Sequence, residues 1–318
     1  DTAAINEALA SGGTVMLTGP ATYRVTDRLL LPIPRTRLLF DKAVTLRTQA
    51  WRYRGGQTPF GNAIHITADD CEVLGTDPTS ILENVGSDAN GIGFLHCGGG
   101  RVARLTLKGG KQSVRAIVDD TFQSGISIVN DRVNHLAQHP SRTTVEDCVI
   151  IDWVQYGINI YGDLANDIAI RRTAISRTGT NGDRGSVGGG IALTRGVGPI
   201  LIEDSTISDN KGYGLFISSA GAEVHDVMVS NNRIIGNGLD GIRASEERNF
   251  GGTDAIGLRR VTISRNRIEK NGAMGIRVGT YDGIGSIRDM VVTRNRLVEN
   301  RGSGILLQAN DVPGRDVH

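Results

Sequence analysis

The sequence predicts an all-β chain coiled into one right-handed parallel β-helix, a solenoid with a capping helix at its amino-terminal end. Three observations support this prediction: an apolar window recurs along the chain, a Gly-apolar pair follows each window, and asparagines share fixed positions relative to the windows. Self-similarity with a period of roughly 20 to 50 residues is typical of stacked repeat units. Glycine also accounts for 43 of 318 residues, about twice its usual share of roughly 7%, as expected of a chain that turns often.

The recurring window has six residues, beginning with Val or Ile and ending with Ile or Leu. Its six copies start at Val145, Ile170, Ile202, Val229, Ile263 and Val292. Apolar and polar residues alternate within and beside the windows, and β-branched residues are frequent, which indicates strands. A helical repeat is therefore disfavoured, and the leucine spacing of leucine-rich repeats is missing.

A Gly-apolar pair follows every window. The pairs are Gly157-Ile158, Gly190-Ile191, Gly214-Leu215, Gly241-Ile242, Gly275-Ile276 and Gly304-Ile305. In five windows the apolar residue lies thirteen positions after the window start, whereas the window at Ile170 is followed by eight extra residues. A constant spacing inside a variable period predicts two strands joined by a constant turn, with loops of variable length elsewhere.

Two columns of polar residues are expected at the turns. The fourth window position holds Cys148, Thr173, Ser205, Asn232, Asn266 and Asn295, and the ninth position holds Asn210, Asn237, Asn271 and Asn300. In coils stacked about 4.8 Å apart these side chains would lie one above another. Asparagine amides in that arrangement can hydrogen-bond along the stack, and asparagine tolerates the left-handed conformation that sharp corners need.

The amino-terminal third is expected to continue the solenoid. Residues 1–30 form the cap and first strands: Thr2–Ala10 is a short amphipathic helix, and Gly12-Gly13 ends it before a strand begins at Thr14. A helix over the open apolar end would cap the stack, as solenoids require. Further strands are expected at Ala63–Ile66, Gly91–Phe94, Leu105–Lys108 and Gly125–Ile128. Because no linker is evident, residues 1–318 are interpreted as a single domain.

Composition excludes several classes of function. Lys and Arg total 35 against 34 for Asp and Glu, with no long run of one sign, so nucleic acid is not an expected partner. No run approaches the roughly 18 apolar residues of a membrane span. Cys71, Cys97 and Cys148 are too few for a disulfide framework or a zinc site and are expected to be buried. An oligomer of identical chains is compatible with the sequence.

The residues then indicate a family. The opening Asp1–Leu9, followed by Gly12–Leu17 and Tyr23-Arg24-Val25, resembles the start of pectate-lyase-like β-helix proteins, a group of polysaccharide lyases, epimerases, glycosidases and tailspikes. Tyr156–Tyr161, which reads Tyr-Gly-Ile-Asn-Ile-Tyr, is similar to the catalytic motif Tyr-Gly-Phe-Asp-Pro-His of mannuronan C5-epimerases. Asn159 replaces the aspartate and Tyr161 the histidine, so the motif is not intact. The resemblance implies a polysaccharide substrate and a secreted or periplasmic location.

Alternation along the Gly-apolar strand predicts a groove. If Ile158 and Ile160 point inward, Asn159 and Tyr161 point outward. The same rule exposes Ala192 and Thr194, Phe216 and Ser218, Arg243 and Ser245, Arg277 and Gly279, and Leu306 and Gln308. This stripe would follow the solenoid axis and suit a polymer. The long connections are expected to wall it: 119–142, 178–187 and 246–254.

Acidic sugars are the favoured substrates. Elimination or C5-epimerisation requires that the sugar carboxylate be neutralised and that the C5 proton be transferred. The catalytic candidates are Tyr156, Tyr161, His135, Asp152 and Arg195. The substrate-binding candidates are Asn159, Asp131, Asp163, Arg243, Glu246 and Arg277.

Two alternatives remain. A glycoside hydrolase or transglycosylase would need two carboxyl groups about 5 Å or roughly 6.5–9.5 Å apart, and the available pairs are Asp152 with Asp163, Asp119 with Asp120, and Glu246 with Glu247. A non-catalytic glycan-binding or tailspike-like β-helix would need no catalytic residues of either kind. No cofactor is expected, and calcium is optional because no twelve-residue calcium loop is present.

Overall fold

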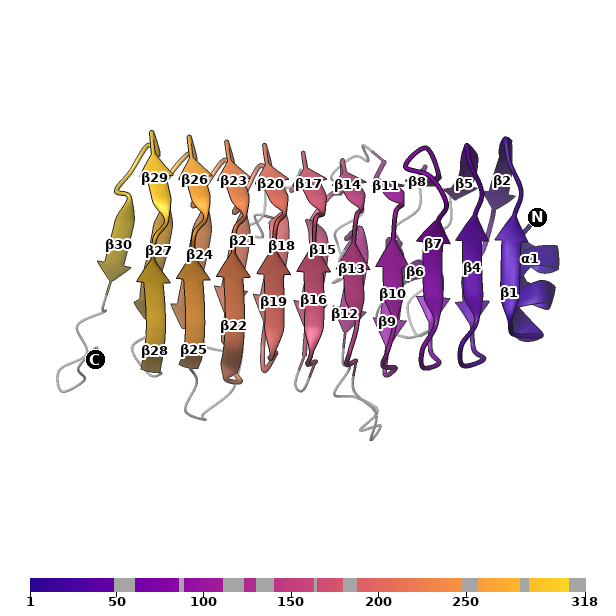
Figure 1. Ribbon diagram of the computed structural model, residues 1–318, viewed down its shortest axis with the longest axis horizontal. Coiled ribbons are helices and arrows are strands. Elements are labelled where there is room, and N and C mark those ends of the chain that lie inside the picture. The colour runs from indigo at the N-terminus through magenta and orange to yellow at the C-terminus, as the bar shows by residue number, and fades with distance from the viewer. Residues whose placement is uncertain are drawn as a thin grey trace.

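The chain forms a stack of coils around one long axis (Figure 1). The computed structural model describes residues 1–48, 61–85, 89–110, 123–129, 140–162, 165–179, 188–246, 257–280 and 286–308. Within these ranges there are one helix, α1 (Thr2–Ala10), and three parallel sheets of ten strands each. Each coil contributes one strand to each sheet, which we name A, B and C in the order in which the chain enters them.

The strands of each sheet recur at every third element. Sheet A contains β1 (Thr14–Leu17), β4 (Arg37–Phe40), β7 (Glu72–Gly75), β10 (Arg101–Ala103), β13 (Thr144–Glu146), β16 (Ile168–Arg171), β19 (Ile200–Glu203), β22 (Val224–Ser230), β25 (Gly257–Ser264) and β28 (Ser286–Thr293). Sheet B contains β2 (Ala21–Val25), β5 (Val44–Thr48), β8 (Ile81–Asn84), β11 (Thr106–Lys108), β14 (Val149–Ile151), β17 (Ala174–Ser176), β20 (Thr206–Ser208), β23 (Arg233–Ile235), β26 (Arg267–Glu269) and β29 (Arg296–Val298). Sheet C contains β3 (Leu29–Leu31), β6 (Asn62–Ile66), β9 (Asn90–Leu95), β12 (Ile126–Val129), β15 (Tyr156–Tyr161), β18 (Gly189–Thr194), β21 (Leu215–Ser218), β24 (Ile242–Glu246), β27 (Ile276–Thr280) and β30 (Ile305–Gln308).

The core is built from columns of aliphatic residues that the strand register holds one above another. In sheet B, Ile150 pairs with Ile175, which pairs with Ile207, and the column continues through Ile234 and Ile268. All five are fully buried. Because each removes its side chain from water, a contribution of roughly 1.5–3 kcal/mol per residue is expected from burial alone.

The two predicted polar columns are confirmed. In the column between sheets A and B, Nδ2 of Asn232 donates to Oδ1 of Asn266 over 3.1 Å, and Asn266 donates likewise to Asn295 over 3.0 Å. The column between sheets B and C repeats this contact at 2.9 Å at each step, through Asn210, Asn237, Asn271 and Asn300. These amides satisfy backbone groups at the corners, where no sheet bond is available.

The left-handed corners lie one residue before each column. Asp147, Asn231 and Arg265 have φ between 54° and 57°, whereas the asparagines that form the ladder are not among the residues with positive φ. A left-handed residue turns the chain sharply into sheet B, so the ladder side chain points inward. The residue before each column asparagine therefore adopts the left-handed conformation, and the asparagine itself does not.

The recurring glycine has a steric cause. A Cβ on Gly214 would lie 2.5 Å from the carbonyl oxygen of Gly241 in the next coil and 2.6 Å from Cγ2 of Ile234. The entry into sheet C is too close to the adjacent coil for a side chain. This explains why the Gly-apolar pair repeats.

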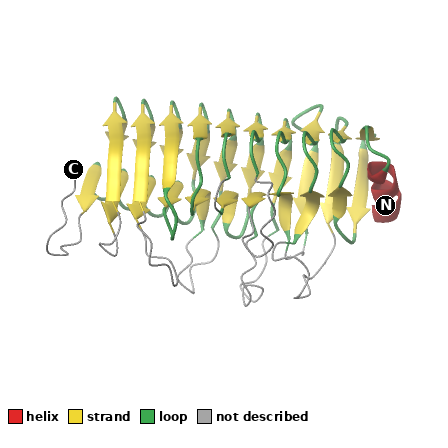
Figure 2. Ribbon diagram, turned by 90° about the horizontal axis from the view of Figure 1, so that it is seen from below, coloured by secondary structure: helices red, strands yellow, loops and turns green. Residues whose placement is uncertain are grey.

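Helix α1 covers the amino-terminal end of the stack beside β1 (Figures 1 and 2). Ile5 and Leu9 are buried in the hydrophobic core, so the predicted cap is confirmed. At the opposite end, Leu307 is 72% exposed because β30 is the last described strand of sheet C. Among the described helical residues, no segment is long and apolar enough to cross a membrane.

The cysteines behave as small apolar residues. Cys71, Cys97 and Cys148 are buried and free, as predicted. Burial is the largest influence on each, and it raises the pKa of the Cys97 and Cys148 thiols to about 12. These thiols are therefore protonated at neutral pH and poor nucleophiles.

The variable connections meet sheet C. The eight extra residues of the second window fall between β17 of sheet B and β18 of sheet C. The connections at residues 49–60, 111–122 and 180–187 lead into sheet C, and those at 130–139 and 247–256 leave it. Sheets A and B are joined by short corners, of three to five residues in the first three coils and of two residues thereafter, so the long connections are concentrated at the two edges of sheet C.

Candidate functional site

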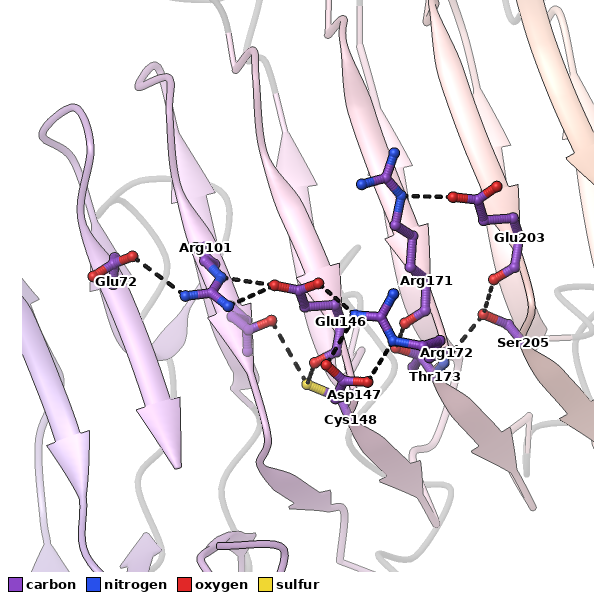
Figure 3. Close-up of polar contacts among 11 residues, drawn as sticks. Glu72, Arg101, Glu146, Asp147, Cys148, Arg171, Arg172, Thr173, Glu203 and Ser205 are labelled. Atoms are coloured by element: carbon purple, nitrogen blue, oxygen red, sulfur yellow. Dashed lines mark hydrogen bonds and ion pairs between the residues drawn. The ribbon is translucent and has the colours of Figure 1, made fainter. Parts of the chain in front are cut away.

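The middle of the outer face of sheet A carries charged side chains that neutralise one another. Arg101 lies between Glu72 and Glu146, with Nη1 3.7 Å from Glu72 and Nη2 2.6 Å from Glu146. Farther along, Arg171 pairs with Glu203 at 2.7 Å. Figure 3 shows these pairs as a row along the axis. Partial burial raises the pKa of Glu146, but hydrogen bonds from the arginines outweigh it, so the pKa lies below its usual value.

Sheet B has similar rows. Glu83 contacts Arg47 at 2.7 Å and Lys108 at 3.0 Å, and Glu269 contacts Arg267 at 2.6 Å. Such exposed pairs are worth little individually, but each carboxylate has a partner: Glu83 bridges to the two neighbouring coils, and Glu269 pairs within its own strand. The charged residues described on the outer faces of sheets A and B are therefore interpreted as structural ion pairs in contact with solvent.

The outer face of sheet C differs. The predicted stripe is in register: Asn159 pairs with Ala192, Ala192 with Phe216, Phe216 with Arg243, and Arg243 with Arg277. The prediction that the whole stripe is exposed is wrong, because Asn159 and Ala192 are buried. Phe216, Arg243 and Arg277 are partly exposed. The open part of this face therefore lies over β21, β24 and β27.

Tyr161 and Arg195 come together at the end of two neighbouring strands. Nη1 of Arg195 donates a hydrogen bond to the hydroxyl of Tyr161 over 2.9 Å. The guanidinium carbon also lies 5.9 Å from the centroid of the tyrosine ring. A phenol and a cation are thereby held next to each other, and both are only partly buried.

A second cluster joins Tyr213, Phe216 and Arg243. The rings of Tyr213 and Phe216 are stacked, with centroids 5.2 Å apart and planes inclined by 16°. Arg243 donates to the Tyr213 hydroxyl, and its guanidinium carbon lies 5.3 Å and 5.8 Å from the two ring centroids. An aromatic pair crossed by an arginine offers both an apolar surface and a positive charge.

Arg277 follows one coil later. Its Nε lies 3.0 Å from Oδ2 of Asp240, and Nη2 lies 3.4 Å from Oδ1. Asp240 is almost fully buried and accepts a further hydrogen bond from the amide of Met274. The carboxylate therefore orients the guanidinium of Arg277 toward the outer face.

The remaining candidates lie elsewhere. Tyr156 is buried at the start of β15 and pairs with Gly189, whereas Tyr161 ends the same strand. Asp152 occupies the left-handed corner before that strand, where it accepts hydrogen bonds of 2.8 Å and 3.0 Å from Arg177. Glu246 is fully buried at the end of β24.

Other predicted residues fall outside the described ranges. They are Asp119, Asp120, Asp131, His135, Asp163 and Glu247. The carboxylate pairs proposed for hydrolysis each include at least one of them. In the described ranges, no group of three or more His, Cys, Asp or Glu side chains could hold a metal ion.

Sequence reasoning missed Tyr213 and Asp240. Tyr213 precedes Gly214 just as Tyr156 precedes Gly157, so comparison of equivalent positions could have identified it. Asp240 occupies the same position before Gly241. Because these residues stand where the chain enters sheet C, their side chains can reach the stripe of outward residues.

A family model described as a right handed beta helix region matches residues 90–253, more than half of the chain. The chain belongs to this right-handed β-helix family. Both the predicted fold and its hand are thereby confirmed. No curated protein sequence matches this β-helix.

Solved structures share the architecture. The A-module of mannuronan C-5 epimerase AlgE4 from Azotobacter vinelandii has 15% identity and a TM-score of 0.50, with 100% of this chain and 95% of that one covered. Alginate lyase from Paenibacillus sp. strain FPU-7 has 13% identity and a TM-score of 0.54, with coverage of 89% and 98%.

A mutant tailspike protein of the E. coli bacteriophage HK620, in complex with a pentasaccharide, has 14% identity and a TM-score of 0.62. The match covers 97% of this chain and 55% of the tailspike, about half its length. At these identities the similarities show the fold alone, while function depends on the site that each protein carries.

Proposed function

We propose that this β-helix binds an acidic polysaccharide along the outer face of sheet C and acts on it by β-elimination or C5-epimerisation. The observation that carries this proposal is the contact between Arg195 and Tyr161. It joins a fixed positive charge to a group that can transfer a proton, and these are the two requirements of uronate chemistry. Proteins of this fold that are named for acting on or binding glycans, an epimerase, a lyase and a tailspike, support it.

The roles follow from the chemistry of the groups. The Arg195 guanidinium binds the sugar carboxylate and stabilises the negative charge that develops when a base removes the C5 proton. In elimination the C4–O bond then breaks, and a phenol such as Tyr161 protonates the leaving oxygen. In epimerisation no bond to C4 breaks, and a proton returns to C5 from the opposite side of the ring.

The second cluster extends the binding surface. The stacked rings of Tyr213 and Phe216 offer an apolar face to a sugar ring, and Arg243 adds positive charge beside them, whereas Arg277 in the next coil is already paired with Asp240. Arginine is well suited to planar carboxylates. Because the arginines of sheets A and B that are described above are matched by carboxylates along their rows, those rows offer a polyanion less than sheet C does.

The test compares two polymers of the same linkage, mannuronan and the corresponding neutral mannan. Three measurements are made: ultraviolet absorbance of unsaturated ends, release of reducing ends, and proton NMR of the polymer. Absorbance with new reducing ends on mannuronan alone supports elimination, whereas a changed NMR spectrum without chain cleavage supports epimerisation. Lack of any change in mannuronan or a wider panel of acidic polysaccharides would contradict the proposal.

The same measurements address the other functions. Reducing ends without absorbance would favour hydrolysis or transglycosylation, and binding without turnover would favour a glycan-binding β-helix. Hydrolysis ranks second because Asp152 is engaged by Arg177.

We also propose a secreted or periplasmic location and no obligatory cofactor, with calcium optional. Fractionation of expressing cells and activity after chelator treatment test these points.

A further inference from the structure

Five arginines stand on the outer side of the last three strands of sheet B and of the corners that lead into them. β23, β26 and β29 each contribute one, and the corners before β26 and β29 contribute one each: Arg233, Arg267, Arg296, Arg265 and Arg294. All five are exposed. These strands lie at the carboxy-terminal end of the stack (Figure 1). We name these five residues the arginine face.

The asparagine ladder explains why the arginines stand on the outside. Arg265 and Arg267 flank Asn266, and the same Arg-Asn-Arg sequence surrounds Asn295 one coil later. The two asparagines point inward and hydrogen-bond to each other along the stack. Because side chains alternate between the two sides of a strand, the flanking arginines are left on the outer side.

Strand register arranges the arginines in two columns. Arg233 pairs with Arg267, and Arg267 pairs with Arg296, so three guanidinium side chains start about 4.8 Å apart along the axis. Arg265 and Arg294 hold the same corner position in successive coils, because the amide of Arg265 donates to the carbonyl of the residue before Arg294. The positive charges therefore follow the solenoid axis.

Carboxylates do not match this charge. Oε1 of Glu269 lies 2.6 Å from Nε of Arg267 and 3.8 Å from Nε of Arg296. At the corner that follows, Lys270 and Glu299 lie 3.7 Å apart and offset each other. Within the described ranges, the other three arginines of the face have no ion pair: Arg233, Arg265 and Arg294. One carboxylate thus serves five guanidinium groups.

This arrangement is the opposite of the one at the other end of sheet B, where Glu83 lies between Arg47 and Lys108. Like charges directly opposite each other on neighbouring strands destabilise a sheet. A stack of arginines therefore costs stability that alternating charges avoid, and an anion bound across the column would relieve the repulsion. Arginine suits this role because its planar guanidinium binds a carboxylate through two parallel hydrogen bonds.

The arginine face is accessible. The corners before β23, β26 and β29 have two residues each, and the connections from these strands into sheet C, residues 236–241, 270–275 and 299–304, are all described. The side chains of Arg267 and Arg296 are 54% and 71% exposed. An extended polyanion can lie across such a surface without an enclosing pocket.

We propose that the arginine face is a second binding surface for the acidic polysaccharide, separate from the reacting face of sheet C. β24 and β27, which carry the open part of sheet C, directly follow β23 and β26 in the same coils. The two surfaces therefore lie on adjacent sides of the same end of the solenoid. Sheet B holds one segment of the polymer while another segment reacts on sheet C. This inference rests on the proposed function.

The test combines three substitutions in one variant, at the arginines that leave no paired carboxylate behind: Arg233→Gln, Arg265→Gln and Arg294→Gln. A control variant removes the same charge at exposed positions outside the arginine face: Arg24→Gln, Arg35→Gln and Arg288→Gln. Thermal melts establish that both variants are folded. The first variant should melt no lower than the wild type, because it removes repulsion and no ion pair.

Binding of long mannuronan is measured at low and high salt, and turnover is measured on long mannuronan and on a short mannuronan oligosaccharide. At low salt the arginine-face variant should bind the long polymer about tenfold more weakly than the wild type. The difference should shrink at high salt, because exposed charges are screened. Turnover of the short oligosaccharide depends on sheet C alone and should be unchanged, whereas KM for the long polymer should rise. The control variant should behave as the wild type.

Wild-type affinity of the arginine-face variant for long mannuronan would overturn the second surface, and normal turnover of the short oligosaccharide by the wild type would then leave the proposed function standing. Equal losses in the two variants would also overturn it, because they would reflect net charge alone. Duplex DNA is the competing polyanion, and a variant that loses binding to DNA but keeps binding to mannuronan would overturn the choice of partner. A wild-type protein that turns over neither form of mannuronan nor any other acidic polysaccharide would overturn the proposed function and this inference together.

Discussion

Nη1 of Arg195 donates a hydrogen bond to the hydroxyl of Tyr161 across 2.9 Å, although 34 residues separate them in the chain. The contact follows from the pairing of Tyr161 with Thr194, the residue before Arg195. The eight extra residues between β17 and β18 do not alter this register, because they lie outside the paired strands. Stacking has thus placed a cation beside a phenol at the open edge of sheet C.

The first prediction concerns this pair. Arg195→Gln and Tyr161→Phe should each lower turnover of the acidic polymer by about a hundredfold, since each removes a group that stabilises or relays charge in the reaction. If the two act as a unit, the double variant should lose little more than either single variant. Rates of the three variants measure the coupling. Fully additive losses would show that the two residues act independently.

The second prediction distinguishes the two tyrosines of β15. Tyr156→Phe should abolish turnover at an unchanged melting temperature if the resemblance to the epimerase motif carries over to this residue. Tyr156 is more buried than Tyr161, so a thermal melt must accompany the assay. Full activity in Tyr156→Phe would remove Tyr156 from the mechanism and leave Tyr161 as the tyrosine of the site.

The third prediction concerns the asparagine ladder. Asn237 donates to the Ile207 carbonyl at 3.2 Å and to Asn271 at 2.9 Å, and it accepts from Asn210. Asn237→Ala should lower the free energy of unfolding by about 2–4 kcal/mol, because it leaves several buried groups unpaired. Urea unfolding checks this value. Asn300→Ala, at the half-buried end of the same ladder, is the control and should cost less. Equal losses at both positions would argue against a cooperative ladder.

The fourth prediction is a pH dependence of stability. The pKa of His65 is about 4 in the folded chain and 6.5 ordinarily. Between these values the unfolded chain takes up a proton that the folded chain does not, so stability falls as the pH drops from 6.5 to 4. The full effect is about 3 kcal/mol. The melting temperature should therefore fall less steeply with decreasing pH in His65→Gln than in His225→Gln, the matched histidine control on the outer face of sheet A. Identical pH profiles of the two variants would contradict it.

Much of the fold could be predicted because the repeat is periodic. Windows that start at Val145, Ile170 and Ile202 show the same alternation, and the polar positions within them form the columns that hydrogen-bond in the structure. A parallel stack places residues that occupy the same position in successive repeats in contact, so the repeat in the sequence predicts which residues are neighbours in space. The helix Thr2–Ala10 was predictable for a similar local reason, namely its pattern of apolar residues.

The site was predicted only in part. Arg243 and Arg277 were identified from alternation and Arg195 from the chemistry that a uronate requires, but the partners of these arginines were not. Tyr213 and Asp240 reach the stripe from the corner before sheet C, and only the packing of one coil on the next decides such contacts. The burial of Asn159 was missed because alternation shows which way a side chain points and not what lies above it.

The amino-acid sequence by itself determined the architecture: strand period, corner residues and glycine positions are local properties, and a repeat multiplies them along the chain. Only the tertiary structure decided which outward residues meet, which are covered, and which polar atoms remain without partners. Those properties depend on the distance between coils and on side chains from different coils. For that reason the pairing of Tyr161 with Arg195 and the enclosure of His65 could be seen only in three dimensions.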